Sequence, residues 1–393
     1  MTLRRVTIVS NALDDLTRVE RGIASDSPAA SRKVLQLCAA LRSAGIRPRV
    51  LSLGRGRADG TWRWHRRSVR RVGGIPVLYA PFSRLPGVSE LVSLFAPAAL
   101  LWRLRGPGPQ ALLFYNREPA YLPSLLLGRL LGFKTLFDLE DGEVGRDAHR
   151  WRGLLSRAVR RLYDRLCGGG ALLACSALSA MTTVRPLLCY YGVAERSASA
   201  ARWSAPQLSV LLGGTLAAET GANLLVDTIA HLRRTRPAWA GRLHFEISGK
   251  GPSLAAFSAL AGSAEAPSVT VHGRLSDVGY RELLARCDIG LALKPRRGAL
   301  ADTTFPSKVV EMASAGMLVL STDISDVRAV LGDGALYLER DEPSALCELL
   351  RLAAEDPVAA RALAERGAQA VWARCEPAAA GRAVADFIFG AAG

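Results

Sequence analysis

The chain lacks the short motifs that mark several large enzyme and binding-protein classes. Its seven cysteines include no Cys-x-x-Cys pair, so their spacing fits neither a zinc site nor a disulfide framework. There is no Walker loop, no Gly-x-Ser-x-Gly elbow, no His-Glu-x-x-His pair and no Gly-x-Gly-x-x-Gly after the first strand. These absences argue against a zinc finger, a P-loop NTPase, a serine hydrolase of that kind, a zinc protease and a dinucleotide dehydrogenase.

Long hydrophobic runs are also missing. The longest apolar stretches cover residues 88–102 and 121–131, and neither reaches the roughly 20 residues that cross a bilayer. The first ten residues lack the apolar core of a secretion signal and are typical of a strand. The cysteines stand in apolar segments, as small buried residues do in a reducing compartment. We therefore expect a cytoplasmic protein that stays in solution or sits at the inner face of the cell membrane.

Acidic residues are too few to balance the basic ones. The 51 Lys and Arg exceed the 35 Asp and Glu, which leaves a net charge of +16. The excess is densest in residues 62–71 and 151–165. Nucleic acid, an anionic membrane and phosphorylated ligands are the candidate partners for such a charge. Because no basic tail or aromatic RNA-binding signature is present, we expect no nucleic-acid partner.

Short apolar runs alternate with amphipathic stretches along the whole chain, which predicts an α/β protein with parallel sheets. Strands are expected at residues 5–10, 49–53, 76–79, 111–115, 134–138, 171–175, 187–190, 208–212, 242–247, 268–271, 289–293, 318–321 and 335–338. The clearest helices are expected at 28–44, 156–166, 357–370 and 377–389.

The alternation breaks at residues 194–206, a small, polar and aperiodic stretch that is typical of a linker. We therefore expect two Rossmann-like, doubly wound domains that face each other across a cleft, over residues 1–200 and 201–375. The last helix, in residues 376–393, has no strand after it, and we expect it to pack back on the first domain.

The most informative stretch covers residues 305–322, Phe-Pro-Ser-Lys-Val-Val-Glu and its continuation. A helix is expected to start near Pro306, since proline is favoured at the first helical position. The free N–H groups of a helix start attract anions, and Lys308 adds a full positive charge. Glu311 follows one turn later, where its carboxylate can accept hydrogen bonds from two ribose hydroxyls. Gly316 is expected to end the helix before the next strand.

This stretch resembles the signature of the retaining GT-B glycosyltransferases of the family-four group, also called group 1 glycosyl transferases, in a Phe-Pro-Ser-Lys variant. The family pattern is Glu-x7-Glu followed by Ala-x-Gly-x-Pro-Val. Glu311 matches the second Glu, which the resemblance implies binds the donor ribose. Thr303 stands at the first Glu, which contacts the donor sugar in the family.

Further turns of the second half resemble the family in the same order. Residues 245–252 resemble its strand and Gly-x-Gly-Pro turn, residues 271–274 its base-binding turn, and residues 211–221 its opening loop. The Arg and Lys of that opening loop are replaced by Thr215 and Thr220, so we expect Lys250, Lys294, Arg296 or Lys308 to supply the charge. The donor-binding residues implied are Gly214, Thr215, Lys250, Gly251, Gly273, Arg274, Lys294, Phe305, Pro306, Ser307, Lys308 and Glu311.

In the first half, residues 136–143 end a strand with four carboxylates. The family has a His-Asp-like pair near the acceptor at this position, and here Glu140 and Asp141 stand in its place. The resemblance implies that they contact the acceptor hydroxyl and, with Lys308, form the catalytic set. A solvated acidic loop explains the same residues equally well.

The family resemblance implies transfer of a sugar from a nucleoside-diphosphate sugar to a hydroxyl acceptor, with retention. The acceptor can be a glycan, a lipid-linked intermediate or a small-molecule glycoside. No metal and no cofactor are expected, since the nucleotide sugar is a substrate. Two alternatives stay open: a sugar-nucleotide epimerase of the same fold, and a non-catalytic GT-B subunit that binds a partner.

A peripheral contact with an anionic membrane is a further expectation. Residues 62–71 interleave Trp with Arg, and the apolar stretch 88–102 is followed by Arg103 and Arg105. The alternative is a solvated basic loop and a buried crossover helix.

Overall fold

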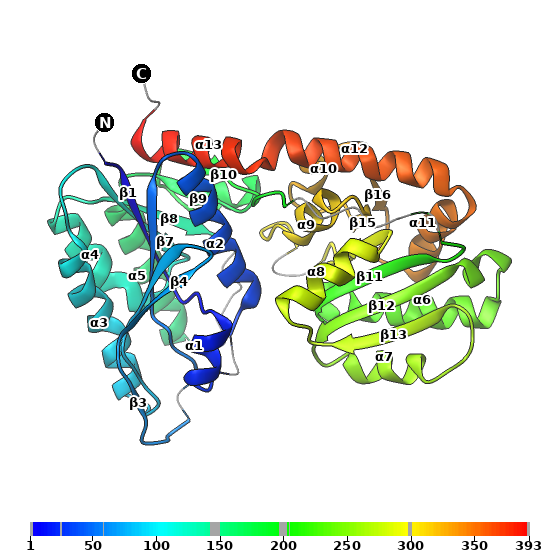
Figure 1. Ribbon diagram of the computed structural model, residues 1–393, viewed down its shortest axis with the longest axis horizontal. Coiled ribbons are helices and arrows are strands. Elements are labelled where there is room, and N and C mark those ends of the chain that lie inside the picture. The colour runs from blue at the N-terminus through cyan, green and yellow to red at the C-terminus, as the bar shows by residue number, and fades with distance from the viewer. Residues whose placement is uncertain are drawn as a thin grey trace. The chain divides into compact units, whose positions relative to one another are not determined.

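The chain divides into two compact units in the computed structural model (Figure 1). Unit 1 comprises Met1–Val193 and Pro377–Gly393, and unit 2 comprises Ala194–Glu376. The structure describes residues 3–23, 26–57, 59–141, 150–195, 203, 205–297 and 301–390, with the side chains of 150–153 excepted. Most of the expected linker therefore lies outside the described residues.

Unit 1 contains an eight-stranded sheet in the order β10-β9-β8-β7-β1-β2-β5-β4. All neighbours are parallel except β4, which runs antiparallel to β5 at one edge. The strands are β1 (Arg5–Ser10), β2 (Arg47–Ser52), β4 (Ser68–Val72), β5 (Ile75–Tyr79), β7 (Gln110–Tyr115), β8 (Lys134–Leu139), β9 (Ala171–Leu173) and β10 (Leu187–Cys189). A separate pair joins β3 (Trp64–His65) to β6 (Phe82–Ser83).

Helices cover both faces of this sheet (Figure 1). One face carries α2 (Pro28–Ser43), and α13 (Pro377–Phe389) packs against α2. The other carries α3 (Val88–Leu104), α4 (Leu122–Leu130) and α5 (Arg150–Leu166). The short elements are α1 (Asp15–Glu20), η1 (Pro119–Tyr121) and η2 (Ser176–Met181).

Unit 2 contains a six-stranded, fully parallel sheet in the order β13-β12-β11-β14-β15-β16. Its strands are β11 (Leu208–Thr215), β12 (Leu243–Lys250), β13 (Ser268–Gly273), β14 (Ile289–Ala292), β15 (Leu318–Thr322) and β16 (Ala335–Leu338). Its helices are α6 (Ala222–Thr235), α7 (Leu254–Ala261), α8 (Asp277–Arg286), α9 (Lys308–Ser314), α10 (Val327–Leu331), α11 (Pro343–Glu355) and α12 (Pro357–Cys375), with short turns η3 (Ala218–Thr220) and η4 (Ala238–Arg242).

The order of these six strands is that of a dinucleotide-type Rossmann sheet, 3-2-1-4-5-6. The chain reverses direction across the sheet between β11 and β14, which are neighbours. Sheets of this kind bind ligands in the crevice beyond the carboxyl ends of their strands at such a reversal. The central strands β14 and β15 are buried along their whole length, as expected where helices cover both faces of a parallel sheet.

Two local expectations are corrected. Residues 62–71 are not a loop: they contain β3 and part of β4, which pairs with β5 because its alternating residues can extend the sheet edge. The helix expected at Pro306 begins at Lys308, and Pro306 forms the turn before it, where its carbonyl accepts from the Val309 N–H. Helix starts often differ from sequence expectation by this amount.

Candidate functional site

The predicted donor residues of unit 2 lie at the carboxyl edge of its sheet. Thr215 is the last residue of β11, Lys250 the last of β12 and Gly273 the last of β13. Lys294 follows β14 by two residues, and Lys308 begins the helix that leads to β15. Parallel strands bring all of these ends to one edge, so residues from five segments of the chain share one surface.

Glycines allow the ends of β11 and β12 to approach each other closely. A Cβ on Gly249 would lie 1.7 Å from the Gly214 carbonyl oxygen, and one on Gly251 would lie 2.2 Å from the Leu216 oxygen. Only glycine fits at such distances. The Gly-x-Gly turn after β12 is therefore packed directly on the turn after β11.

Lys308 joins α9 to the end of β11. Its Nζ donates a hydrogen bond to the Gly213 carbonyl oxygen. A Cβ on Gly214 would lie 1.7 Å from this Nζ, so Gly214 leaves the room that the ammonium occupies. An ammonium has three donors, and the bond to Gly213 uses one of them. Lys308 is thus a half-buried lysine that backbone holds at this edge.

The neighbours of this lysine in the Phe-Pro-Ser-Lys stretch differ in exposure. Phe305 is buried, Ser307 is exposed at the N-cap of α9 without a side-chain capping bond, and Glu311 is half-buried one turn beyond Lys308. The hydroxyl of Thr303, where the family has its first Glu, is itself buried and has no hydrogen-bond partner among the described residues.

Two other candidate groups are engaged elsewhere. The guanidinium of Arg296 donates to the Leu338 carbonyl at the end of β16, and its backbone N–H donates to Asp341 at 2.8 Å. The Thr220 hydroxyl donates to the Thr215 carbonyl at 2.6 Å and so closes the loop between them. The exposed Lys250 has no ion-pair partner among the described residues, and Arg274 is exposed as well. Lys250 and Lys308 are therefore the better candidates for a charged ligand.

In unit 1, Glu140 follows β8 and meets a lysine that the sequence analysis missed. Lys33 of α2 forms an ion pair with Glu140, and its Nζ lies 3.7 Å from Asp138 Oδ1 and 5.2 Å from the Tyr190 ring centre. Burial, together with the nearby Asp138 charge, raises the pKa of Glu140 to about 8 despite this lysine. The Lys33–Glu140 contact joins residues 107 positions apart, so no local pattern could have revealed it.

The other predicted acceptor residue, Asp141, is exposed at the same carboxyl edge. Residues 142 and 143 of that acidic stretch lie outside the described residues. Part of this edge is hollow, with a volume of about 630 Å³. The hollow is lined by Asn11, which follows β1, by residues 55–57, which follow β2, and by Pro86, Ser89 and Glu90. Both amide atoms of Asn11 bond to the Arg55 backbone, at 2.9 and 3.0 Å, and hold this rim in place.

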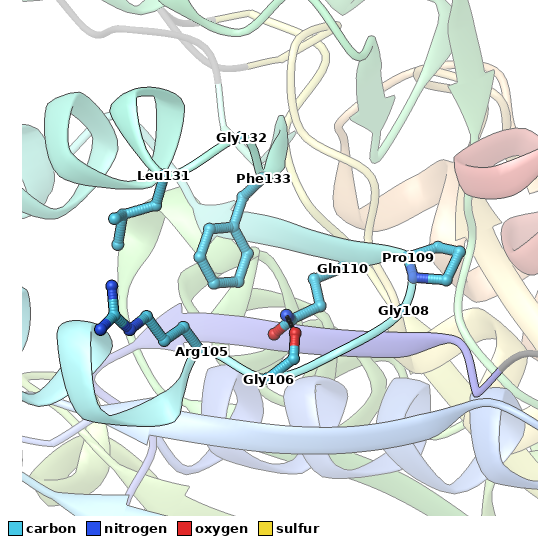
Figure 2. A pocket seen from close by; sticks show the side chains of 8 residues that line it. All are labelled: Arg105, Gly106, Gly108, Pro109, Gln110, Leu131, Gly132 and Phe133. Atoms are coloured by element: carbon cyan, nitrogen blue, oxygen red, sulfur yellow. Dashed lines mark hydrogen bonds between the residues drawn. The ribbon is translucent and has the colours of Figure 1, made fainter.

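A second hollow, of about 530 Å³, opens at the opposite edge of the unit 1 sheet (Figure 2). It lies between the segment that enters β7, with Arg105 and Gln110, and the turn that enters β8, with Leu131 and Phe133. It contains none of the predicted site residues, because those follow the carboxyl ends of strands.

A polar cluster on β12 and β13 was also missed. Glu246 accepts from His272 Nε2 at 2.5 Å and from Arg286 Nη2 at 3.0 Å. Burial opposes the charge of this carboxylate, but the histidine hydrogen bonds and Arg286 outweigh it and hold its pKa at about 2. The period-two alternation of His244, Glu246 and Ser248 is the signal that could have indicated a polar sheet face. The cluster lies directly before the predicted Gly273–Arg274 turn.

Residues 207–356 match the family model described as glycosyl transferases group 1. No curated protein sequence matches the chain. Among solved structures it is similar to Alr3699/HepE from Anabaena in complex with UDP, at a TM-score of 0.66 and 14% identity over 97% of this chain and 98% of that chain. It is also similar to sucrose-phosphate synthase from Thermosynechococcus elongatus, at a TM-score of 0.67 and 12% identity over 98% of each chain. A third is alpha,alpha-trehalose 6-phosphate synthase from Burkholderia multivorans, at a TM-score of 0.63 and 14% identity over 98% of each chain.

The two Rossmann-like sheets and these structural neighbours confirm the expected GT-B fold. The matched family region covers all six strands of the unit 2 sheet and helix α9 with Lys308 and Glu311. The chain therefore has the GT-B fold and carries a group 1 glycosyl transferase domain over residues 207–356.

Proposed function

We propose that unit 2 binds a nucleoside-diphosphate sugar at the carboxyl edge of its sheet and that the enzyme transfers the sugar, with retention, to a hydroxyl acceptor bound by unit 1. The observation that carries the donor proposal is the Lys308 ammonium held over Gly213 and Gly214 at the chain reversal of the Rossmann sheet. UDP is the first nucleotide to test, since the similar Anabaena protein was crystallised with UDP and with UDP-glucose.

The chemistry requires the protein to stabilise negative charge on a leaving diphosphate. Lys308, which the Gly213 carbonyl holds at this edge, is the cation proposed to donate to phosphate oxygens. Lys250, at the end of the neighbouring strand, is the candidate second cation. Glu311 is proposed to accept hydrogen bonds from the donor ribose, and the turn at Gly273 and Arg274 to border the base.

The acceptor is proposed to bind at the carboxyl edge of unit 1, where the hollow of about 630 Å³ opens and where Asp141 is exposed. In this proposal Asp141 contacts the acceptor hydroxyl. Glu140 is tied to Lys33 and positions this edge of the sheet.

Calorimetry with UDP and uridine separates the roles of the two donor residues. Lys308→Ala is expected to weaken UDP binding by about 2 kcal/mol, or roughly thirtyfold, because it removes a charged hydrogen bond to phosphate, and to leave uridine binding unchanged. Glu311→Ala is expected to weaken both ligands similarly, because ribose is common to them. Lys134→Ala, an exposed lysine at the amino end of β8, is the matched control and should change neither.

Equal losses of UDP and uridine in Lys308→Ala would show that this lysine only supports the fold. If UDP does not bind, the same titrations with GDP, ADP and dTDP test the other bases. Nucleotide binding without hydrolysis or transfer from any nucleotide sugar in a panel would favour a non-catalytic binding subunit.

A further inference from the structure

Helix α3 carries an exposed apolar stripe. Val88, Leu91, Phe95 and Trp102 are all exposed, with Phe95 at 62% and Trp102 at 48%. At 3.6 residues per turn these positions fall on one side of the helix. Its opposite side, with Ser93, Pro97 and Leu101, is buried in the unit. The helix is therefore apolar on both sides, which is unusual for a helix that faces water.

The neighbouring helices of the same layer extend this surface. On α4, which packs against α3, Leu126 and Leu130 are exposed, the latter at 84%. On α5, which packs against α4, Leu154 and Leu155 are exposed. Figure 1 shows the three helices side by side on one face of the unit 1 sheet. We call their outward surface the three-helix face. Soluble proteins rarely leave this many large apolar side chains on one exposed layer.

The charge of the three-helix face has one sign. Helices α3, α4 and α5 contain eight arginines and two acidic residues. One of the two acidic residues, Asp164, forms an ion pair at 2.8 Å with Arg117, which lies outside these helices. The exposed arginines of α5 are Arg157, Arg160, Arg161 and Arg165, and none forms an ion pair with another described residue. The apolar stripe is thus bordered by uncompensated positive charge.

The hollow of Figure 2 lies where this surface ends. Arg105 follows α3 directly and its guanidinium lies 4.1 Å from the Trp102 ring centre, while Leu131 follows α4 directly. One wall of the hollow therefore presents a guanidinium and the other presents Leu131 and Phe133 (Figure 2). This pairing of a cation with an apolar wall matches a phosphate headgroup and the beginning of its acyl chain.

We propose that the three-helix face docks unit 1 on an anionic lipid bilayer. The exposed aromatic and aliphatic side chains would enter the headgroup region, and the arginines would pair with lipid phosphates. Among the described residues no helix is long and apolar enough to cross a membrane, so the docking is peripheral. The inference stands apart from the proposed transfer reaction, because vesicle binding is measured without substrate.

Charge and composition favour lipid over the other occupants of such a surface. A second copy of this chain would bring its own arginines against the same positive face, and like charges repel. A nucleic acid would use the arginines but would leave the exposed leucines and Val88 without a role. An anionic bilayer satisfies both components of the face.

The test is co-flotation of the full chain with vesicles of phosphatidylcholine alone and of phosphatidylcholine mixed with phosphatidylglycerol. The wild type is expected to float with the mixed vesicles only. The double variant Phe95→Gln, Leu130→Gln should bind at least about tenfold more weakly, because it removes the most exposed apolar groups. The double variant Arg157→Gln, Arg161→Gln should lose about fivefold for each charge removed and should show a weaker dependence on salt.

Trp62→Gln is the matched control, since Trp62 is 90% exposed in the same unit but lies outside the three helices. It should bind the mixed vesicles like the wild type. The proposal is overturned if the wild type does not float, or if Trp62→Gln loses binding while the three-helix variants keep it. If the wild type binds a single-stranded RNA and does not bind vesicles, the face is assigned to nucleic acid. Self-association that disappears in Phe95→Gln, Leu130→Gln would assign it to a second copy. All variants change exposed side chains, and circular dichroism verifies that they fold.

Discussion

At the scale of single residues, Glu140 is a carboxylic acid of unit 1 whose pKa is raised strongly. Burial and the Asp138 charge raise its pKa to about 8, so Glu140 keeps its proton to a higher pH when folded and pairs with Lys33 as a charge once it ionises. Burial alone would lower the pKa of Lys33, but the carboxylates around it outweigh that effect and raise it, so Lys33 stays charged through the same range. The site therefore holds one more proton when folded than when unfolded, between the ordinary pKa of a glutamate and about 8.

This proton predicts the pH dependence of stability. When the folded state binds more protons than the unfolded state, the free energy of unfolding falls as pH rises. The stability of unit 1 should therefore decrease between about pH 5 and about pH 8, and Glu140→Gln, which mimics the protonated form, should remove most of this decrease. Urea unfolding of both proteins at pH values across this range measures it. An unchanged slope in the variant would mean that Glu140 is ionised in the folded protein.

At the scale of elements, the contact between α13 and α2 depends on one glycine. Gly381 is buried on α13, and a Cβ at this position would lie 2.0 Å from the Ala40 carbonyl oxygen of α2. The helix also buries Val384, Ala385 and Ile388 in the core of unit 1. The last helix of the chain is thus part of the first unit, 184 residues after that unit's first segment ends at Val193.

Replacing Gly381 with alanine should have the opposite effect on stability from that of most glycine-to-alanine substitutions in helices. Glycine to alanine in a helix interior normally stabilises by up to about 1 kcal/mol. Gly381→Ala should instead destabilise unit 1 by about 1–3 kcal/mol, because the helices must separate to admit the methyl group. Gly279→Ala in α8 is the control, since a Cβ at this position would lie at an ordinary 3.5 Å from its nearest neighbour. This substitution should stabilise unit 2. Thermal unfolding measures both, and a gain in melting temperature for Gly381→Ala would contradict the close contact.

At the scale of the whole molecule, the chain carries an excess of positive charge, which would attract the diphosphate of the proposed donor. The chain has a net charge of +16, and Lys308 and Lys250 lie at the carboxyl edge of the unit 2 sheet. Among the described residues no group of three His, Cys, Asp or Glu side chains is placed to hold a metal ion. Lysine side chains can stabilise a leaving diphosphate without a divalent ion.

We therefore predict that transfer or donor hydrolysis persists in excess EDTA, with a rate within about twofold of the untreated enzyme because the charge on the diphosphate is met by lysine. The measurement is nucleoside-diphosphate release before and after chelation, with Mg²⁺ and Mn²⁺ added back. A strict requirement for either ion would instead indicate Asp138, Glu140 and Asp141 as its ligands, since carboxylate oxygens suit these ions.

The sequence by itself determined the α/β class, nearly all strands of both sheets, the helix that carries Lys308 and Glu311, and the Gly-x-Gly turn. These follow from local period and from residues within a few positions of each other. Three features needed the tertiary structure. The contact of Lys308 with Gly213 joins residues 95 positions apart, and the pairing of Lys33 with Glu140 spans 107. Sequence period also cannot distinguish a crossover helix with an exposed apolar side from a fully buried one, because α3 is apolar all round, and only the packing of α4 and the sheet shows which side faces water.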